Sequence, residues 1–338
     1  MRFRMNLWLV AGLALASCLP AATHGKPVAK PVSNLQPLKA LLATPERQVD
    51  YAQAKIAIDR FIDPSIDPKA VNRQLDTLVA SIKVRTPVGV SNRTKVEILL
   101  ATLYRPGPWN GNRPFRYDLN DPFGRTLRNK LLATYLATRQ GNCVSMPILV
   151  LILGQKLGLP VTLATAPEHV LVKYLDARGE WQNIETTAGG FKYDSSYERE
   201  LGISAQATAN QIYLRPLRPH EAIGVMLSTA MEAAAAKDRQ EQRIAIAELA
   251  LSVNPKDVVA MVHEGAADYL LLQERYVRKY PRPVDIPVAL RKDFQTLSEQ
   301  NLSWYARAEA LGWAPPSQAQ DANYLQNIER ERSRRKGN

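Results

Sequence analysis

The chain has 338 residues, a length that favours two domains over one. Hydrophobic residues make up 46% of the sequence and charged residues 22%, which is ordinary for a globular protein with a sizeable core. The formal net charge is +12 at pH 7. Because only two cysteines are present, the chain is not a small scaffold held together by disulfides.

The opening residues combine positive charge with a short apolar run, a pattern typical of an export signal. Arg2 and Arg4 precede the apolar residues 7–16, and this run is too short to span a bilayer as a permanent helix. The run ends in Leu-Ala-Ser-Cys18, which resembles the bacterial lipobox. We therefore predict a lipoprotein-type signal peptide over residues 1–17, lipidation of Cys18, and an exported, periplasmic protein with a lipid anchor in a bacterial membrane.

Simple cleavage near Ala21 or Ala22, without lipidation, is the alternative. In both cases Cys143 would be the only free thiol of an exported protein, so no internal disulfide could form. In an oxidising compartment such a thiol is either buried or kept for its reactivity. Export also argues against nucleic acid as the partner of the positive charge, and it favours anionic membranes or envelope polymers.

The folded part is predicted to follow a linker rich in proline, alanine, lysine and threonine, which we assign to residues 18–40. A core domain then covers residues 41–215. Its first part shows apolar residues at helical spacing, and Asp67-Pro68 is a typical helix start. The helices predicted here span residues 51–61, 70–84 and 95–104.

The segment between residues 104 and 124 is rich in proline, glycine and asparagine, but it also carries Trp109, Phe115 and Tyr117. Segments of this length inside a compact domain are usually functional or disordered, and three aromatic rings argue against disorder. We interpret the segment as a flap beside a functional site. An Ω-loop that packs on its own rings is the alternative.

The next segment brings a cysteine to the start of a helix that is apolar on nearly every side and therefore buried. Either Asn142 or Ser145 caps this helix, because Pro147 has no N–H to donate one turn back. With both alternatives Cys143 lies within about one turn of the helix N-terminus. The two helices predicted around this point span residues 127–138 and 144–157.

Three strands follow, and the last two form a hairpin whose polar turn we centre on Arg178. With that centre, His169 faces Thr187 and lies diagonal to Glu185 on the same face, because side chains alternate along a strand. A shift of the turn by one residue would place the two side chains on opposite faces. The predicted strands span residues 161–165, 169–174 and 181–186.

Cys143, His169 and Glu185 together form the set of groups that a thiol nucleophile needs. The thiolate is the reactive form, and a helix N-terminus and a neighbouring imidazolium both stabilise it. We therefore predict Cys143 as the nucleophile, His169 as the base, and Glu185 as the group that orients the imidazole. The backbone N–H of Cys143 would bind the oxyanion, with help from Gln140 or Asn142.

Each of these residues also has an interpretation without catalysis. Cysteine is among the most buried residue types, so Cys143 can be an inert core residue. A redox sensor is a further alternative for the same thiol. His169 alone can cap a strand end, and Glu185 alone can be a solvated strand residue, so only their combination favours catalysis.

The other histidines, His24, His220 and His263, have no Cys, Asp or Glu companions at metal-ligand spacing. The sequence contains no glycine-rich phosphate loop and no Gly-x-Ser-x-Gly nucleophile elbow. We therefore predict no cofactor and no metal site.

The C-terminal part is predicted to be an all-α domain over residues 216–315. Two helices flank Asn254-Pro255, and the pair resembles the junction between two tetratricopeptide units, with Ala247 and Ala250 where that repeat needs small residues. These two helices span residues 241–253 and 258–272. The last segment, residues 316–338, is rich in arginine, and its composition predicts a basic, disordered tail.

Several short motifs repeat a known pattern: Tyr117-Asp-Leu-Asn-Asp-Pro122, Arg139-Gln-Gly-Asn-Cys-Val-Ser145, Leu157-Gly-Leu159, Pro167-Glu-His-Val-Leu-Val172 and Glu185-Thr-Thr-Ala-Gly-Gly190. Together they resemble the bacterial transglutaminase-like core family, in the SirB-type branch that is often joined to tetratricopeptide helices. The resemblance covers roughly residues 45–270. It implies a papain-like α+β fold, in which a buried helix carrying the thiol packs on a small antiparallel sheet carrying the histidine.

By this resemblance Cys143 would be the nucleophile, His169 the base and Glu185 the orienting residue. The family usually has aspartate at the third position, so the glutamate here is one methylene longer. Many members of the branch lack the cysteine, and the fold alone therefore does not establish catalysis.

Two functions fit these observations. The first is an exported cysteine enzyme, a peptidase, amidase or acyl transferase, that cleaves or transfers an amide or acyl group of a peptide or protein through a thioester on Cys143. The second is an inactive transglutaminase-like scaffold whose tetratricopeptide-like helices bind a protein or envelope partner. The sequence specifies no oligomeric state.

Overall fold

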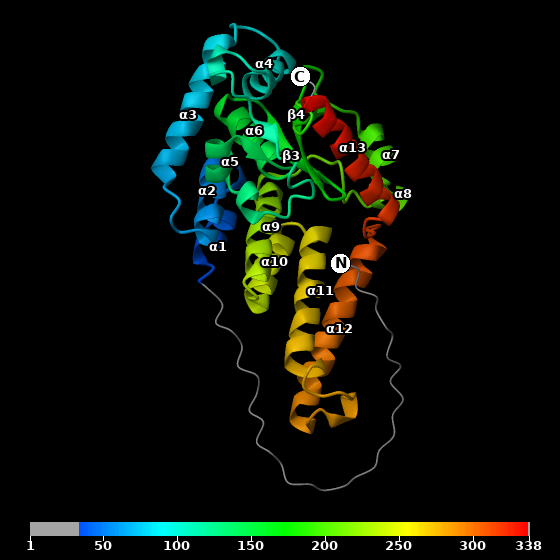
Figure 1. The fold of residues 1–338 in the computed structure, drawn as a ribbon. Coiled ribbons are helices and arrows are strands. Elements are labelled where there is room, and N and C mark those ends of the chain that lie inside the picture. Colours follow the sequence, from blue (N-terminus) through cyan, green and yellow to red (C-terminus); the bar gives the residue numbers. More distant parts are fainter. Residues whose placement is uncertain (1–33, 337–338) are drawn as a thin grey trace.

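The computed structural model describes residues 34–336, which form a largely helical protein around one small sheet (Figure 1). The predicted signal peptide, Cys18 and nearly all of the predicted linker lie outside the described residues. The main sheet is antiparallel, with the strand order β3-β4-β5-β6. Its strands are β3 (Val161–Ala166), β4 (His169–Leu175), β5 (Trp181–Glu185) and β6 (Gly190–Phe191).

The N-terminal helices begin at caps that the sequence itself carries. The side chains of Asp50, Asp67 and Ser91 each accept a hydrogen bond from a backbone N–H in the first helical turn. The first helix begins at Gln36, inside the predicted linker, because Leu38 is fully buried in the main core. These helices are α1 (Gln36–Ala43), α2 (Tyr51–Ile62), α3 (Pro68–Arg85) and α4 (Asn92–Tyr104), and a 3-10 turn, η1 (Glu46–Gln48), separates the first two.

The segment after α4 is held in place by its aromatic residues. Phe115 and Tyr117 are buried, and the ring of Phe115 packs edge-on against Tyr135 at a centroid distance of 5.1 Å. A short parallel pair of strands joins this segment to the residues just before Cys143. The segment is therefore packed on the core through these rings and lies adjacent to the predicted site. Its elements are η2 (Pro108–Asn110) and β1 (Arg116–Tyr117), which pairs with β2 (Gln140–Gly141).

The helix predicted over residues 127–138 is divided in two. A 3-10 turn, η3 (Leu127–Lys130), is followed by an extended Leu131 and then by α5 (Leu132–Thr138). The carboxylate of Asp59 in α2 accepts a hydrogen bond from the backbone N–H of Leu132 at 2.7 Å. A buried side chain from another helix therefore sets the start of α5.

The helix α6 (Ser145–Lys156) is the centre of the core. Its residues 145–154 are all buried. It packs on β3 and β4 on one side and on α2, α3, α4 and α5 on the other. Gly154 permits the close contact with the sheet, because a Cβ at this position would lie 2.8 Å from a methyl group of Val161. A buried helix on a small antiparallel sheet is consistent with the predicted α+β class.

The hairpin of β4 and β5 has the predicted register. Val172 faces Ile184 and Leu175 faces Trp181, so the turn is centred on Arg178. Two short helices that the sequence pattern did not predict come after β6. They bury only Tyr197 and Ala207, respectively, which explains why no apolar periodicity marks them. They are α7 (Asp194–Leu201) and α8 (Ala205–Ala209).

The first C-terminal helices share the core of the rest of the molecule, whereas residues between Leu271 and Leu297 form a separate apolar cluster. The first of these helices packs on α1, α2 and β3, and its apolar side chains belong to the same cluster as those of α6. The predicted boundary between residues 215 and 216 therefore does not separate two hydrophobic cores. The helices are α9 (Pro219–Ala236), α10 (Gln240–Val253), α11 (Val258–Leu272), the π turn η4 (Gln273–Val277), the 3-10 turn η5 (Pro283–Asp285) and α12 (Val288–Ala310).

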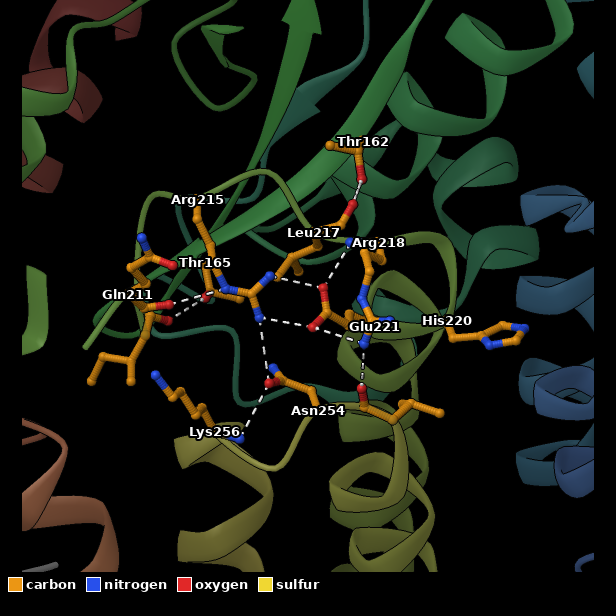
Figure 2. A network of polar contacts seen from close by, with 12 residues as sticks. Thr162, Thr165, Gln211, Arg215, Leu217, Arg218, His220, Glu221, Asn254 and Lys256 are labelled. Carbon is orange, nitrogen blue, oxygen red and sulfur yellow. Dashed lines mark hydrogen bonds and ion pairs between the residues drawn. The ribbon is translucent and has the colours of Figure 1, made fainter. Parts of the chain in front are cut away.

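A polar network links the sheet to these helices, as Figure 2 shows. Arg215 donates two parallel hydrogen bonds to the carboxylate of Glu221 in α9, at 2.8 and 2.9 Å, and a third to Asn254 Oδ1 at 3.4 Å. Asn254 lies in the turn between α10 and α11. At the other end of the network, Thr162 Oγ1 of β3 donates to the carbonyl of Leu217 at 2.5 Å.

The tail that composition predicted to be disordered forms α13 (Gln318–Lys336) instead. Ser317 and Gln320 make a capping box, in which Gln320 N–H donates to Ser317 Oγ at 3.2 Å and Ser317 N–H donates to Gln320 Oε1 at 2.7 Å. Glu331 pairs with the two arginines that follow it at helical spacing. Local pairing thus overrides the composition. No helix within residues 34–336 is long and apolar enough to cross a bilayer.

Candidate active site

Cys143 lies immediately before α6, in a turn held by reciprocal caps. Asn142 Oδ1 accepts hydrogen bonds from the backbone N–H groups of Val144 at 3.0 Å and Ser145 at 3.2 Å. In return, Ser145 Oγ accepts from the backbone N–H of Asn142 at 3.1 Å. Of the two predicted alternatives, Asn142 caps the helix, whereas Ser145 is its first residue and bonds back to the turn. Pro147 is the third residue of the helix, where a backbone N–H has no partner within the helix.

A glycine is required just before this turn. A Cβ on Gly141 would lie 2.5 Å from Ser145 Oγ and 2.6 Å from the ring of Tyr135, which is fully buried and has no room to move. The carbonyl of Gly141 accepts a hydrogen bond from Asp118 N–H at 2.8 Å. The position of the cysteine is therefore fixed from both sides of the chain.

His169 is the first residue of β4. It pairs with Ala166, so Pro167 and Glu168 form a two-residue turn. Glu168 has a φ of +52°, in the left-handed region that a glutamate rarely adopts. Its carbonyl accepts a hydrogen bond from the thiol of Cys143 at 3.8 Å. The strained turn therefore carries the histidine and also contacts the sulfur.

The imidazole of His169 contacts the carboxylate of Glu185, as the hairpin register predicted. The distance from Nε2 to Oε2 is 2.9 Å, and the side chains are 16% and 9% exposed. Because Nε2 is engaged, Nδ1 is the ring nitrogen left for Cys143. Burial by itself lowers the pKa of His169, but the charge of Glu185 and hydrogen bonds to Cys143 and Glu185 raise it to about 10. The imidazole is therefore protonated at neutral pH.

The carboxylate of Glu185 receives four hydrogen bonds. His169 and the hydroxyl of Tyr197 donate to Oε2, the latter at 2.7 Å. The N–H and the hydroxyl of Thr187 donate to Oε1 at 2.9 and 2.6 Å. Burial raises the pKa of Glu185, but the charge of His169 and these hydrogen bonds outweigh it and lower the pKa to about 2. Glu185 is therefore ionised at neutral pH.

Tyr197 and Thr187 were not predicted as functional residues. Tyr197 lies on α7, a helix without an apolar periodicity that could have indicated it. Thr187 was predicted to face His169, but its hydrogen bonds to Glu185 were not predicted. A threonine two residues after a carboxylate is a local signal for such a contact, because its hydroxyl and N–H can reach back along the chain.

The two residues predicted near the oxyanion have different positions. Asn142 is fully buried, its oxygen caps α6, and its Nδ2 lies against Gly124. It therefore supports the turn. Gln140 is exposed and lines a pocket of about 580 Å³ together with Tyr117 and Arg332. A contact with the oxyanion remains a prediction for both residues.

Within residues 34–336, no group of three or more His, Cys, Asp or Glu side chains is arranged to hold a metal ion. His220 Nε2 contacts a backbone carbonyl at 2.7 Å, and His263 Nδ1 accepts a hydrogen bond from Arg243 Nε at 2.9 Å. His24 lies outside the described residues.

The comparison with known protein families agrees with this geometry. Residues 69–228 match the model of the transglutaminase-like superfamily. They include Cys143, His169 and Glu185 as well as Tyr197, and they run from the start of α3 into α9. No curated protein and no solved structure gives a significant match. Residues 69–228 therefore form a transglutaminase-like domain, which is followed by further helices.

Proposed function

We propose that this protein is a cysteine enzyme of the transglutaminase-like type, with Cys143 as the nucleophile, His169 as the base and Glu185 as the group that orients the imidazole. The observation that carries the proposal is the convergence of the three side chains, in which His169 bonds both to Cys143 and to a carboxylate 2.9 Å away. The family match of residues 69–228 supports it, because that superfamily contains cysteine-based enzyme folds.

The pair suits an attack on the carbonyl of an amide or another acyl group. The thiolate of Cys143 forms a C–S bond to the carbonyl carbon, and the charge moves to the carbonyl oxygen. There the backbone N–H of Cys143 and the side chain of Gln140 would stabilise it. As the C–N bond breaks, the imidazolium of His169 gives its proton to the leaving amine, which leaves a thioester and a neutral imidazole.

The second half of the reaction restores the resting state. Water or a second amine attacks the thioester, His169 takes the proton of the attacking group, and the thiolate of Cys143 leaves. Water as the acceptor gives cleavage, and an amine gives transfer. Glu185 keeps the imidazole in the orientation and tautomer that both half-reactions need.

The proposal includes a location and a partner class. A signal peptide over residues 1–17 and lipidation of Cys18 would place the enzyme on a bacterial membrane, in the periplasm, where its substrate would be a peptide or protein. The pair α10 and α11, joined at Asn254-Pro255, has the sequence features of a tetratricopeptide junction. We propose that these helices bind a protein or envelope partner.

The experiment that tests the proposal is alkylation of Cys143 by iodoacetamide, followed by mass spectrometry at a series of pH values. We expect alkylation at about pH 6 to be on the order of tenfold faster in the natural protein than in His169→Ala, because an ordinary thiol is almost fully protonated there. His220→Ala is the matched control, since the imidazole of His220 contacts the backbone carbonyl of Thr44, a residue distant from Cys143 in the sequence. It should leave the rate unchanged.

Two results would overturn the proposal. One is alkylation that requires a denaturant, which would show a buried and inert sulfur. The other is a rate that rises only near the pKa of an ordinary thiol and is unaffected by His169→Ala. Either result would favour the inactive scaffold, in which the transglutaminase-like domain and the C-terminal helices only bind a partner.

A further inference from the structure

The C-terminal helix α13 bridges two parts of the molecule, the end of α7 and the strand β1. Near the start of α13, Gln320 Nε2 donates to the carbonyl of Leu201 at the end of α7, at 3.0 Å. Near its end, Arg335 Nη1 donates to the carbonyl of Tyr117 in β1, at 3.2 Å. In Figure 1, α13 is drawn in front of the sheet region near α7, beyond α11 and α12. The helix therefore spans from the end of α7 to β1.

The middle of α13 is fixed by Tyr324. Its hydroxyl donates to the carbonyl of Pro122 at 2.6 Å and lies 2.9 Å from the hydroxyl of Tyr117. The Tyr117 hydroxyl bonds the same carbonyl at 2.8 Å. The ring of Tyr324 also packs on Phe123, with a centroid distance of 5.5 Å. All these partners belong to the segment between residues 104 and 124, which we interpreted as a flap.

This contact lies on the strand that pairs with the residues just before the nucleophile, because Tyr117 faces Gly141. Ile328, one turn after Tyr324, is buried in the main hydrophobic core, and Cys143 and Tyr324 both pack against that core. Burial raises the pKa of Tyr324, its hydrogen bond with Tyr117 lowers it, and the charge of Cys143 raises it again. The pKa of Tyr117 is raised by burial first and by the charge of Cys143 second. Both phenols are thus within electrostatic reach of the sulfur.

The helix is attached along one narrow stripe. Gln320, Tyr324 and Ile328 repeat every four residues on the side that contacts the domain, and Ile328 alone is buried among the described side chains of α13. On the outer side, Leu325 is 41% exposed. The capping box and the ion pairs of Glu331 lie within α13 and do not depend on its contacts with the domain. The stripe can therefore detach as a unit while the main core stays intact.

We propose that α13 is an autoinhibitory strap, which covers the approach to Cys143 in the resting protein and must move away before a polypeptide substrate can reach the sulfur. This inference rests on the function proposed above for Cys143 and His169. The strap and a substrate compete for the same surface, which is formed by Tyr117, Pro122 and Phe123. A small molecule can react with Cys143 in the closed state, because Cys143 is partly exposed.

The test compares two reagents that share one electrophile and differ in size: N-ethylmaleimide and a maleimide with a long polyethylene glycol chain. The full-length double variant Tyr324→Ser, Ile328→Asp should release the strap. We expect the ratio of the large-reagent rate to the small-reagent rate at Cys143 to rise roughly tenfold, as a closed population is converted to an open one. A chain that ends at Pro316 should give the same ratio, and circular dichroism checks that both variants are folded.

Leu325→Ser is the matched control, because it removes an apolar side chain from the outer side of the same helix. Its ratio should equal that of the natural protein. An unchanged ratio in both folded strap variants would overturn the inference, and so would an equal rise in Leu325→Ser. If Cys143 were an inactive thiol, both reagents would react slowly in every variant, but their ratio would still report access. Failure of the strap and failure of the proposed enzyme are therefore distinguishable.

Discussion

Glu185 reaches His169 from a diagonal position on the neighbouring strand. In the observed register Val172 faces Ile184 and β5 ends one residue later, so Glu185 is level with Leu171 and two residues away from His169 along β4. Diagonal neighbours in a sheet are about 7–8 Å apart, which a long side chain can bridge. The extra methylene of glutamate, compared with the aspartate usual in similar proteins, is suited to this geometry, and Thr187 and Tyr197 then fix the carboxylate.

The ionic pair makes stability depend on pH in a defined direction. The pKa of His169 is raised from 6.5 to about 10, so its stabilisation is complete below pH 6.5 and is lost as the pH rises through about 10. The pKa of Glu185 is lowered from 4.5 to about 2, so its stabilisation is complete above pH 4.5 and is lost as the pH falls through about 2. We expect Glu185→Gln to lower the free energy of unfolding by roughly 3 kcal/mol between these two ordinary pKa values, and by less toward either extreme.

Denaturant unfolding of both proteins at a series of pH values measures this difference. Glu185→Asp is the matched control, because it keeps the charge and shortens the side chain by one methylene. It should lose less stability than Glu185→Gln and retain the dependence on pH. A difference between the natural protein and Glu185→Gln that stays constant from acidic to alkaline pH would show that the two groups do not form an ion pair.

At the scale of single elements, the first turn of α6 controls the environment of the thiol. Asn142→Asp should keep both caps, because a carboxylate also accepts hydrogen bonds from Val144 and Ser145. The added charge is favourable at a helix N-terminus but opposes a thiolate at Cys143. We expect stability to remain within about 1 kcal/mol of the natural protein, while alkylation of Cys143 at mildly acidic pH becomes roughly tenfold slower.

Asn142→Ala separates the effect of the cap from that of the charge. Its loss of both hydrogen bonds should cost about 1 kcal/mol of stability and change the alkylation rate less than the aspartate does. If the two variants slow alkylation equally, the position of the turn and not its charge would govern the reactivity of the sulfur.

The elements that the sequence predicted are those whose signals are local. Asp67 caps its own helix, and α6 is apolar throughout, so this helix start and the buried helix could be predicted. The helix predicted from residue 95 begins at Asn92 instead, because Ser91 caps it. The contact of His169 with Glu185 followed from side-chain alternation and a turn centred on Arg178, which the register confirms.

The elements that were missed depend on distant or minor contacts. The start of α5 is set by Asp59 of α2, and nothing near Leu132 indicates it. The helix α7 buries a single side chain, Tyr197, so the hydroxyl that completes the carboxylate site could not be predicted from periodicity. The helix α13 does have a local signal, the Ser317–Gln320 capping box, but its arginine-rich composition indicated disorder.

At the scale of the whole molecule, one core and one polar network join the sheet to the C-terminal helices. Arg215 makes two parallel hydrogen bonds to Glu221, whose side chain is only 6% exposed. Arg215→Ala leaves this carboxylate with fewer partners and also breaks the contact with Asn254. We expect the variant to lose roughly 2 kcal/mol of stability and to unfold in two calorimetric steps, with the C-terminal helices melting first.

Arg215→Lys is the control, since lysine keeps the charge but cannot make two parallel hydrogen bonds to one carboxylate. It should give an intermediate loss of stability. A single sharp transition for Arg215→Ala, at the melting temperature of the natural protein, would show that the shared hydrophobic core alone joins the two parts.

The nucleophile and its base are carried by different elements, and they meet only where β4 packs on α6. A newly synthesised chain that has not yet made this contact holds a sulfur of ordinary reactivity. Under the proposed function, the reactivity of Cys143 would therefore rise only when the sheet packs on α6. An immature copy would then be chemically harmless until it folds.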